Sequence, residues 1–156
     1  ILGIILASAP DMIGSHLSVQ AGDYKELLKE AKRNIDNNKP MKLLHKMVED
    51  YMYMSSQTYY NWYNENSELN NLPIISNQKN WKQFKTIDVP IFTFSGSREE
   101  DYYLHLDLLK EKAIHCNNFD YKIIDNTGHT YENKELEIGN LIYKWIDKNF
   151  IKSVKK

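Results

Sequence analysis

Three short runs of β-branched and aromatic residues alternate along the chain with long amphipathic stretches. The runs cover residues 1–7, 91–94 and 121–124, and each is followed by turn-forming residues. Apolar runs of this length are typical of strands in a parallel sheet whose two faces are both covered. The pattern therefore predicts an α/β fold with three parallel strands flanked by helices.

A long helical insertion separates the first two predicted strands and covers residues 15–85. Within it, Asp23 and Glu26 have the spacing of a capping box at the start of a helix. A second helix is expected over residues 43–51, where apolar residues recur at helical spacing. A short third helix is expected to begin at the cap Ser56.

Two further amphipathic helices are expected in the carboxyl-terminal half. The first follows the acidic residues 99–101, which would stabilise a helix amino terminus. The second is expected to run from the cap Asn133 to Phe150, with one wide apolar stripe. The predicted order is strand, helical insertion, strand, helix, strand, helix.

Charge and composition exclude several classes of partner. Lys and Arg number 20 and Asp and Glu number 21, so no net positive field attracts nucleic acid or an anionic membrane. The apolar first run is far shorter than the roughly 20 residues of a spanning helix, and no basic leader marks a signal peptide. The single Cys116 cannot form an internal disulfide, which favours the cytoplasm. No Cys/His cluster has zinc spacing, so neither a metal nor another cofactor is expected.

One histidine stands at the end of the third predicted strand. The turn-forming residues 125–128 stop that strand, and His129 follows at once. The carboxyl ends of parallel strands are where open α/β sheets gather their chemistry, and imidazole exchanges protons near neutral pH. His129 is therefore a candidate catalytic residue, with a turn-capping histidine as the alternative interpretation.

The helical insertion carries an aromatic cluster at Tyr59, Tyr60, Trp62 and Tyr63. Rings with a polar tip suit the wall of a small-molecule pocket, and they also suit the packing of the insertion itself. Stacking on single-stranded nucleic acid would need an interleaved basic groove, which this segment lacks.

Several motifs occur in a fixed order along nearly the whole chain. They are an apolar strand ending in Ala-Pro-Asp, the segment Val-Pro-Ile-Phe-Thr-Phe-Ser-Gly-Ser-Arg-Glu, and Asn-Thr-Gly-His before a helix containing Trp-Ile. This succession resembles the carboxyl-terminal half of an α/β-hydrolase. The resemblance implies that residues 1–14 and 86–156 belong to the hydrolase core, and that residues 15–85 form a helical cap over the substrate.

The same resemblance implies a catalytic acid for His129. In the family, a carboxylate three residues after the glycine that closes the penultimate strand orients the histidine, which gives Glu99. The family usually has aspartate there, so the neighbouring Glu100 and Asp101 are alternatives. A few relatives place the acid after the preceding strand, which makes Asp11 the remaining candidate.

The implied activity is that of a serine hydrolase acting on esters or similar acyl substrates. Its nucleophile belongs in a Gly-x-Ser-x-Gly turn ahead of the acid and the histidine, and no such pentapeptide occurs in the sequence. The chain, which starts without methionine inside a predicted strand, is therefore expected to be part of a longer enzyme. Without its amino-terminal half, we expect it to be inactive and poorly soluble.

Two other functions fit the same residues. One is a noncatalytic α/β-hydrolase-like module that binds a small ligand or a protein. The other is a hydrolase with an aspartate nucleophile, as in haloalkane or epoxide chemistry. The residue at the nucleophile position would discriminate among these functions.

Overall fold

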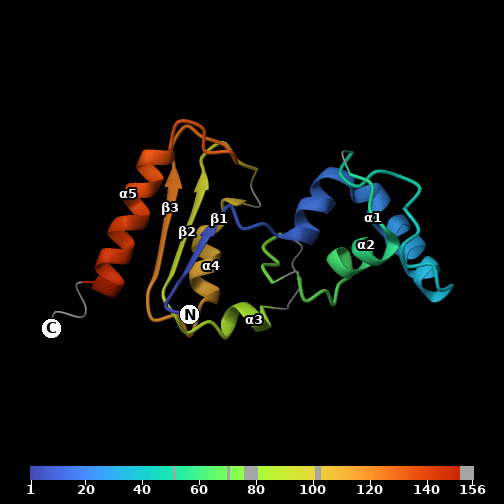
Figure 1. Ribbon diagram of the computed structural model, residues 1–156, viewed down its shortest axis with the longest axis horizontal. Coiled ribbons are helices and arrows are strands. Elements are labelled where there is room, and N and C mark those ends of the chain that lie inside the picture. The colour runs from blue at the N-terminus through green and yellow to red at the C-terminus, as the bar shows by residue number, and fades with distance from the viewer. Residues whose placement is uncertain (51, 70, 76–80, 101–102, 152–156) are drawn as a thin grey trace. The chain divides into compact units, whose positions relative to one another are not determined.

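The computed structural model describes residues 1–50, 52–69, 71–75, 81–100 and 103–151 (Figure 1). The chain divides into two compact units. The first unit comprises Ile1–Ala9 and Gln83–Lys156, and the second comprises Pro10–Lys82. A single turn of helix, α3 (Lys82–Lys85), lies where the chain passes from the second unit to the first.

The first unit is built on a parallel sheet, as the sequence predicts. Its strands are β1 (Ile4–Ala7), β2 (Ile91–Gly96) and β3 (Phe119–Ile124), in the order β1-β2-β3. Both strand pairs are parallel. All three strands therefore end at the same edge of the sheet, and the loops after β2 and β3 meet there.

Helices cover both faces of this sheet (Figure 1). The helix α5 (Glu135–Ile146) packs Trp145 against Phe92 and Phe94 of β2, and a short π-helical turn (Asp147–Ile151) follows it. The helix α4 (Leu106–Lys112) lies on the other face. Since side chains alternate along a strand, β2 supplies apolar residues to both layers and is buried throughout.

The first strand differs from its prediction. β1 lies at an edge of the three-stranded sheet, and its residues alternate between half-buried and exposed. Ile5, for example, is 39% exposed. The expected burial on both faces is therefore not found, because Ile5 and Ala7, which point to the same face of β1, are exposed.

Two predicted helix starts in the first unit are also wrong. The helix after the acidic residues begins only at Leu106, since the chain from Gly96 to Glu99 folds back on the end of β2. The helix α5 is capped by Lys134 without a side-chain hydrogen bond, and Asn133 adopts a left-handed conformation with φ of 60°.

The second unit contains a long helix, α1 (Met12–Asp36), which the sequence predicts to start later. Its amino terminus is capped by Asp11, whose side chain accepts a hydrogen bond from the backbone of Gly14. The predicted capping box at Asp23 and Glu26 is wrong, because both residues lie inside α1. Gln20 has non-helical angles and marks a kink.

The helix expected over residues 43–51 is replaced by an extended segment that doubles back. Val48 and Met52 form an antiparallel bridge, and Glu49 and Asp50 adopt positive φ angles of 53° and 59° in the turn. Tyr51 lies outside the described residues. The short helix α2 (Ser56–Tyr63) is present, but its cap is Ser55 rather than Ser56.

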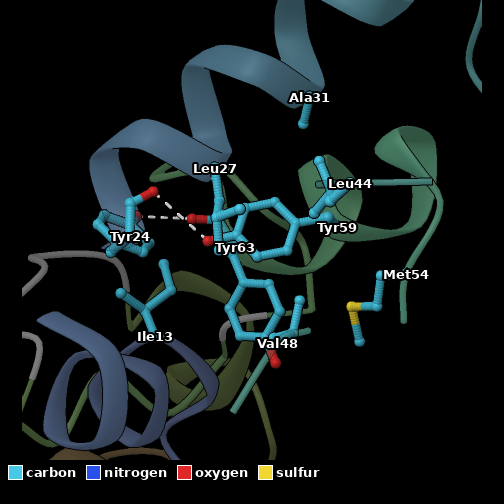
Figure 2. Packing of buried hydrophobic residues seen from close by; sticks show 9 residues of the cluster. All are labelled: Ile13, Tyr24, Leu27, Ala31, Leu44, Val48, Met54, Tyr59 and Tyr63. Carbon is cyan, nitrogen blue, oxygen red and sulfur yellow. Dashed lines mark hydrogen bonds between the residues drawn. The ribbon is translucent and has the colours of Figure 1, made fainter. Parts of the chain in front are cut away.

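The core of the second unit lies between α1, α2 and the extended segment (Figure 2). Tyr24 donates a hydrogen bond from its hydroxyl to the backbone oxygen of Tyr63, at 2.6 Å, which ties α1 to the end of α2. The buried members of this core are Ile13, Tyr24, Leu27, Ala31, Leu44, Val48, Met54, Tyr59 and Tyr63.

Candidate active site

The loops after β2 and β3 are fastened to each other by backbone hydrogen bonds. The backbone N–H of Ser97 donates to Ile124 and that of Arg98 donates to Thr127, both at 2.9 Å. The backbone N–H of Asn126 donates in turn to the Ser97 hydroxyl at 2.9 Å. These contacts hold the residues that follow the two strands in one fixed arrangement.

Gly96 makes this close approach possible. A Cβ atom at Gly96 would lie 2.8 Å from the backbone oxygen of Gly128 and closer still to that of Thr127. Real side chains essentially never come so close to backbone atoms, so glycine is required where the two loops touch.

The arrangement brings together the two residues that the sequence singles out. Oε2 of Glu99 lies 3.1 Å from Nδ1 of His129. The side chain of Glu99 is fully buried, whereas that of His129 is 60% exposed. With Nδ1 donating to the carboxylate, the unprotonated Nε2 lies on the opposite side of the ring and can accept a proton.

The second oxygen of Glu99 is held by two other donors. Oε1 accepts a hydrogen bond from the backbone N–H of Gly96 at 2.6 Å and one from the Ser8 hydroxyl at 2.5 Å. Ser8 follows β1 directly, so the three strand ends all contribute to the site. Because both carboxylate oxygens have donors, the buried charge is compensated and its direction is fixed.

Tyr131 completes this set of contacts. Its hydroxyl is within hydrogen-bonding distance of Ser8 Oγ and lies 3.2 Å from the backbone oxygen of Phe94. Burial raises the pKa of Tyr131 to about 12, although the hydrogen bond with Ser8 acts in the opposite direction. The phenol is therefore neutral near pH 7 and available as a donor.

A tyrosine ring also borders the imidazole. The rings of Tyr103 and His129 lie with their centroids 5.0 Å apart and their planes inclined by 45°. This contact limits the orientations open to the exposed imidazole on one side, while Glu99 fixes it through Nδ1.

The other candidate acids occupy different positions. Glu100 is exposed and Asp101 lies outside the described residues. Asp11 belongs to the second unit, where its two oxygens accept hydrogen bonds from the backbone N–H groups of Gly14 and Ile75, each at 2.8 Å. A carboxylate used in this way has a structural function as a helix cap.

The aromatic cluster of α2 belongs largely to a core. Tyr59 and Tyr63 are fully buried in the second unit and surround His16, whose Nε2 lies 2.7 Å from the Tyr59 hydroxyl. Tyr60 and Trp62 are partly buried against the same core. Packing of the insertion, one of the two interpretations that the sequence left open, accounts for Tyr59 and Tyr63.

Sequence reasoning missed Ser8 and Tyr131. Each stands near the carboxyl end of a predicted strand, and that position was a usable signal for Ser8, since such ends meet at one edge. Tyr131 follows His129 by two residues, but its direction depends on a positive φ of 53°, which the sequence does not reveal.

The described residues contain no group of three or more His, Cys, Asp or Glu side chains suited to holding a metal ion. No helix in the described part of the chain is long and apolar enough to cross a membrane. A histidine whose one nitrogen is fixed by a buried carboxylate is an arrangement suited to general acid–base chemistry.

The sequence matches no protein-family model, and no curated protein is significantly similar to it.

Proposed function

We propose that the protein is an α/β-hydrolase that cleaves esters or similar acyl substrates with His129 as its general base and acid. The observation that carries this proposal is the 3.1 Å contact between His129 Nδ1 and the fully buried carboxylate of Glu99. The resemblance of the strand-end motifs to those of hydrolases supports it. In this proposal residues 15–85 are the helical cap that the family inserts between its strands.

The chemistry assigns one function to each partner. Nε2 of His129 takes the proton of a nucleophilic hydroxyl as that oxygen attacks the acyl carbon, and later returns the proton to the leaving group. Glu99 keeps Nδ1 protonated and stabilises the imidazolium that forms in between. The nucleophile and the oxyanion donors come from a Gly-x-Ser-x-Gly turn and an earlier loop, which we place in an amino-terminal half outside these 156 residues.

Ser8 is not proposed as the nucleophile. Its hydroxyl is buried and donates to Glu99 rather than to the imidazole. A nucleophilic serine needs the imidazole as its proton acceptor. The Ser8 hydroxyl is bonded to Glu99 instead, so it lacks that acceptor.

We propose that the protein is located in the cytoplasm, because its single cysteine cannot form an internal disulfide. The substrate is a small acyl compound, and neither a metal nor an organic cofactor enters the proposed reaction.

The test is hydrolysis of p-nitrophenyl butyrate by the full-length protein. We expect His129→Ala to lower kcat by at least a thousandfold, a loss comparable to removing a triad member. The matched control is His115→Ala, which removes an exposed histidine of the same unit and should leave kcat unchanged. Equal rates for the wild type and His129→Ala would overturn the proposal.

A fluorophosphonate probe distinguishes a serine nucleophile from the alternatives. Covalent labelling of the full-length protein at a serine supports the serine hydrolase. Hydrolysis that depends on His129 without any labelling would instead indicate an aspartate nucleophile. The absence of both activity and labelling would leave the noncatalytic binding module.

A further inference from the structure

We propose that Ser8 and Tyr131 are positioning residues that hold Glu99 in the orientation required by His129. The catalytic consequence rests on the proposed function, whereas the effect on the imidazole does not. Neither residue touches His129 through a hydrogen bond that the structure describes, so each acts through the carboxylate.

The protons in this line of groups can be assigned. Ser8 has one hydroxyl proton, which it donates to Glu99 Oε1 at 2.5 Å. Since that proton is used, Ser8 Oγ is the acceptor in its contact with the Tyr131 hydroxyl. The single phenol proton is then shared between Ser8 Oγ and the backbone oxygen of Phe94, which lies 3.2 Å away. The direction of donation runs from Tyr131 to Ser8 to Glu99, and each bond strengthens the next by polarisation.

The hydrogen bonds to Oε1 prevent the carboxylate of Glu99 from rotating. Oε1 is held by the Gly96 backbone and by Ser8, so the plane of the carboxylate is set before His129 is considered. Oε2 is then left directed at Nδ1. Loss of the Ser8 hydroxyl would leave one backbone donor on Oε1, about which the carboxylate can turn.

The backbone at both residues is held in an uncommon conformation. Ser8 has φ of 42° and Tyr131 has φ of 53°, although neither is glycine. Residues other than glycine rarely adopt left-handed angles, and such conformations gather at functional sites. The backbone N–H of Ser8 also donates to the backbone oxygen of Phe94 at 2.9 Å, which holds the strained residue against β2.

A structural function for the two hydroxyls is the competing explanation. Buried hydroxyls need partners, and Glu99 could simply satisfy them. The two explanations differ in what happens to the imidazole. A positioning function requires the tautomer of His129 to change when Ser8 or Tyr131 loses its hydroxyl, and a purely structural function does not.

The experiment measures the tautomer of His129 by long-range ¹H–¹⁵N NMR on the full-length protein, at a pH where the imidazole is neutral. The signals are assigned with His129→Gln. The test variants are Ser8→Ala and Tyr131→Phe, and the latter keeps the ring that packs on Phe94. The matched controls are Ser18→Ala in the second unit and Tyr143→Phe on the exposed face of α5.

We expect the Nδ1–H form to dominate in the wild type and both controls. In Ser8→Ala and Tyr131→Phe we expect the population of this form to fall toward the mixture of tautomers found in an unrestrained imidazole. Hydrolysis should show a kcat roughly tenfold lower with KM unchanged in both variants, and the double variant should be no worse than Ser8→Ala because both act through one carboxylate.

An unchanged tautomer in both Ser8→Ala and Tyr131→Phe would overturn the inference. A changed tautomer in Glu99→Gln would then show that the carboxylate holds His129 without the two hydroxyls. If instead the tautomer responds as expected while the full-length protein hydrolyses no ester, the positioning function stands and the proposed function fails. Should Ser8→Ala not fold, Tyr131→Phe alone decides the matter.

Discussion

The carboxylate of Glu99 and the imidazole of His129 come from loops after neighbouring parallel strands, and 3.1 Å separates Oε2 of the acid from Nδ1 of the base. Their meeting depends on how closely the two loops pack at Gly96. The geometry of the site therefore depends on Gly96, a residue that has no functional side chain.

Gly96→Ala is expected to destabilise the protein by about 1–3 kcal/mol, since an added methyl group overlaps backbone atoms that cannot move aside. The measurement is the free energy of unfolding from urea titration. Gly139→Ala is the control, because nothing lies within 4 Å of a Cβ at that helical position. It should stabilise by roughly 0.5–1 kcal/mol. Equal effects of the two substitutions would contradict the close approach at Gly96.

Asp11→Asn is expected to retain hydrolytic activity. Both oxygens of Asp11 accept backbone hydrogen bonds in the second unit, and asparagine keeps one acceptor. Since the helix cap is partly preserved, the free energy of unfolding should fall by only about 1 kcal/mol. A loss of kcat comparable to that of His129→Ala, with folding intact, would make Asp11 the catalytic acid in place of Glu99.

Acid should destabilise the second unit through His16. Burial lowers the pKa of His16 from 6.5 to about 4, although the charge of Asp23 acts in the opposite direction. The unfolded chain therefore binds a proton that the folded chain excludes, so the stabilising contribution is complete above pH 6.5 and is lost as the pH falls toward 4. The expected loss is about 3 kcal/mol.

The measurement is the urea unfolding free energy of the wild type and of His16→Phe between pH 4 and 8. Phenylalanine keeps an aromatic ring among the surrounding tyrosines but cannot be protonated. The difference between the two proteins should shrink on acidification. A constant difference across this range would show that His16 is not the group responsible.

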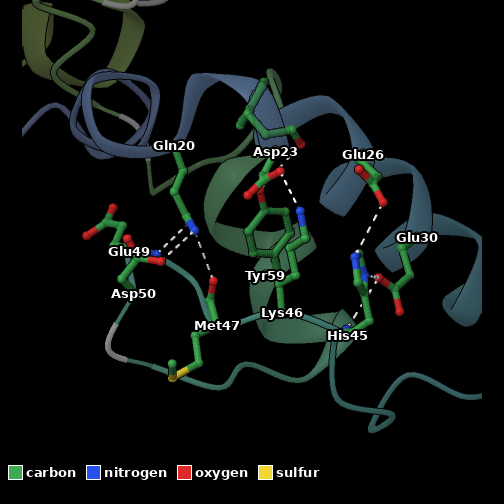
Figure 3. Close-up of polar contacts among 11 residues, drawn as sticks. Gln20, Asp23, Glu26, Glu30, His45, Lys46, Met47, Glu49, Asp50 and Tyr59 are labelled. Carbon is green, nitrogen blue, oxygen red and sulfur yellow. Dashed lines mark hydrogen bonds and ion pairs between the residues drawn. The ribbon is translucent and has the colours of Figure 1, made fainter.

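A second histidine joins α1 to the extended segment. His45 faces two carboxylates of α1, with Nδ1 hydrogen-bonded to Glu30 and Nε2 at 3.3 Å from Glu26 (Figure 3). Burial acts to raise the pKa of Glu30, but its hydrogen bonds with His45 outweigh burial and lower it. The lowered pKa of Glu30 stabilises the folded protein at pH values above the ordinary pKa of a glutamate. This stabilisation is lost as the pH falls below that value.

The two glutamates should differ in their contributions. The side chain of Glu30 is 9% exposed and that of Glu26 is 62% exposed. We expect Glu30→Gln to lower the free energy of unfolding by about 1–3 kcal/mol, and Glu26→Gln by less than about 1 kcal/mol. Urea titrations at pH 7 make the comparison, and a larger effect at Glu26 would refute the distinction.

Local chemistry explains which parts of the fold the sequence predicts. β2 and β3 are recognisable because each β-favouring run is stopped by turn residues, and the same turns place Glu99 and His129 after strand ends that meet. The edge position of β1 was not predictable from its apolar run, because burial of a strand depends on its neighbours rather than on its own residues.

The wrong predictions for the second unit arise from backbone conformations that the pattern of side chains does not reveal. Apolar spacing over residues 43–51 suits a helix, but Glu49 and Asp50 turn the chain through positive φ angles. Asp23 and Glu26 have capping spacing, yet Asp11 caps α1 earlier, and they pair instead with Lys46 and His45. Tyr131 escaped notice for the same reason, because a left-handed backbone conformation brings its hydroxyl to Ser8.

The most direct test of the Glu99–His129 pair is to substitute two adjacent acids in the full-length protein. The kcat of each variant for p-nitrophenyl butyrate is then compared with that of the wild type. In the proposed mechanism, Glu99→Gln removes the charge that stabilises the imidazolium, whereas Glu100→Gln changes an exposed neighbour. The account predicts a kcat at least a hundredfold lower for Glu99→Gln and an unchanged kcat for Glu100→Gln. A full rate in Glu99→Gln, or a loss confined to Glu100→Gln, would contradict it.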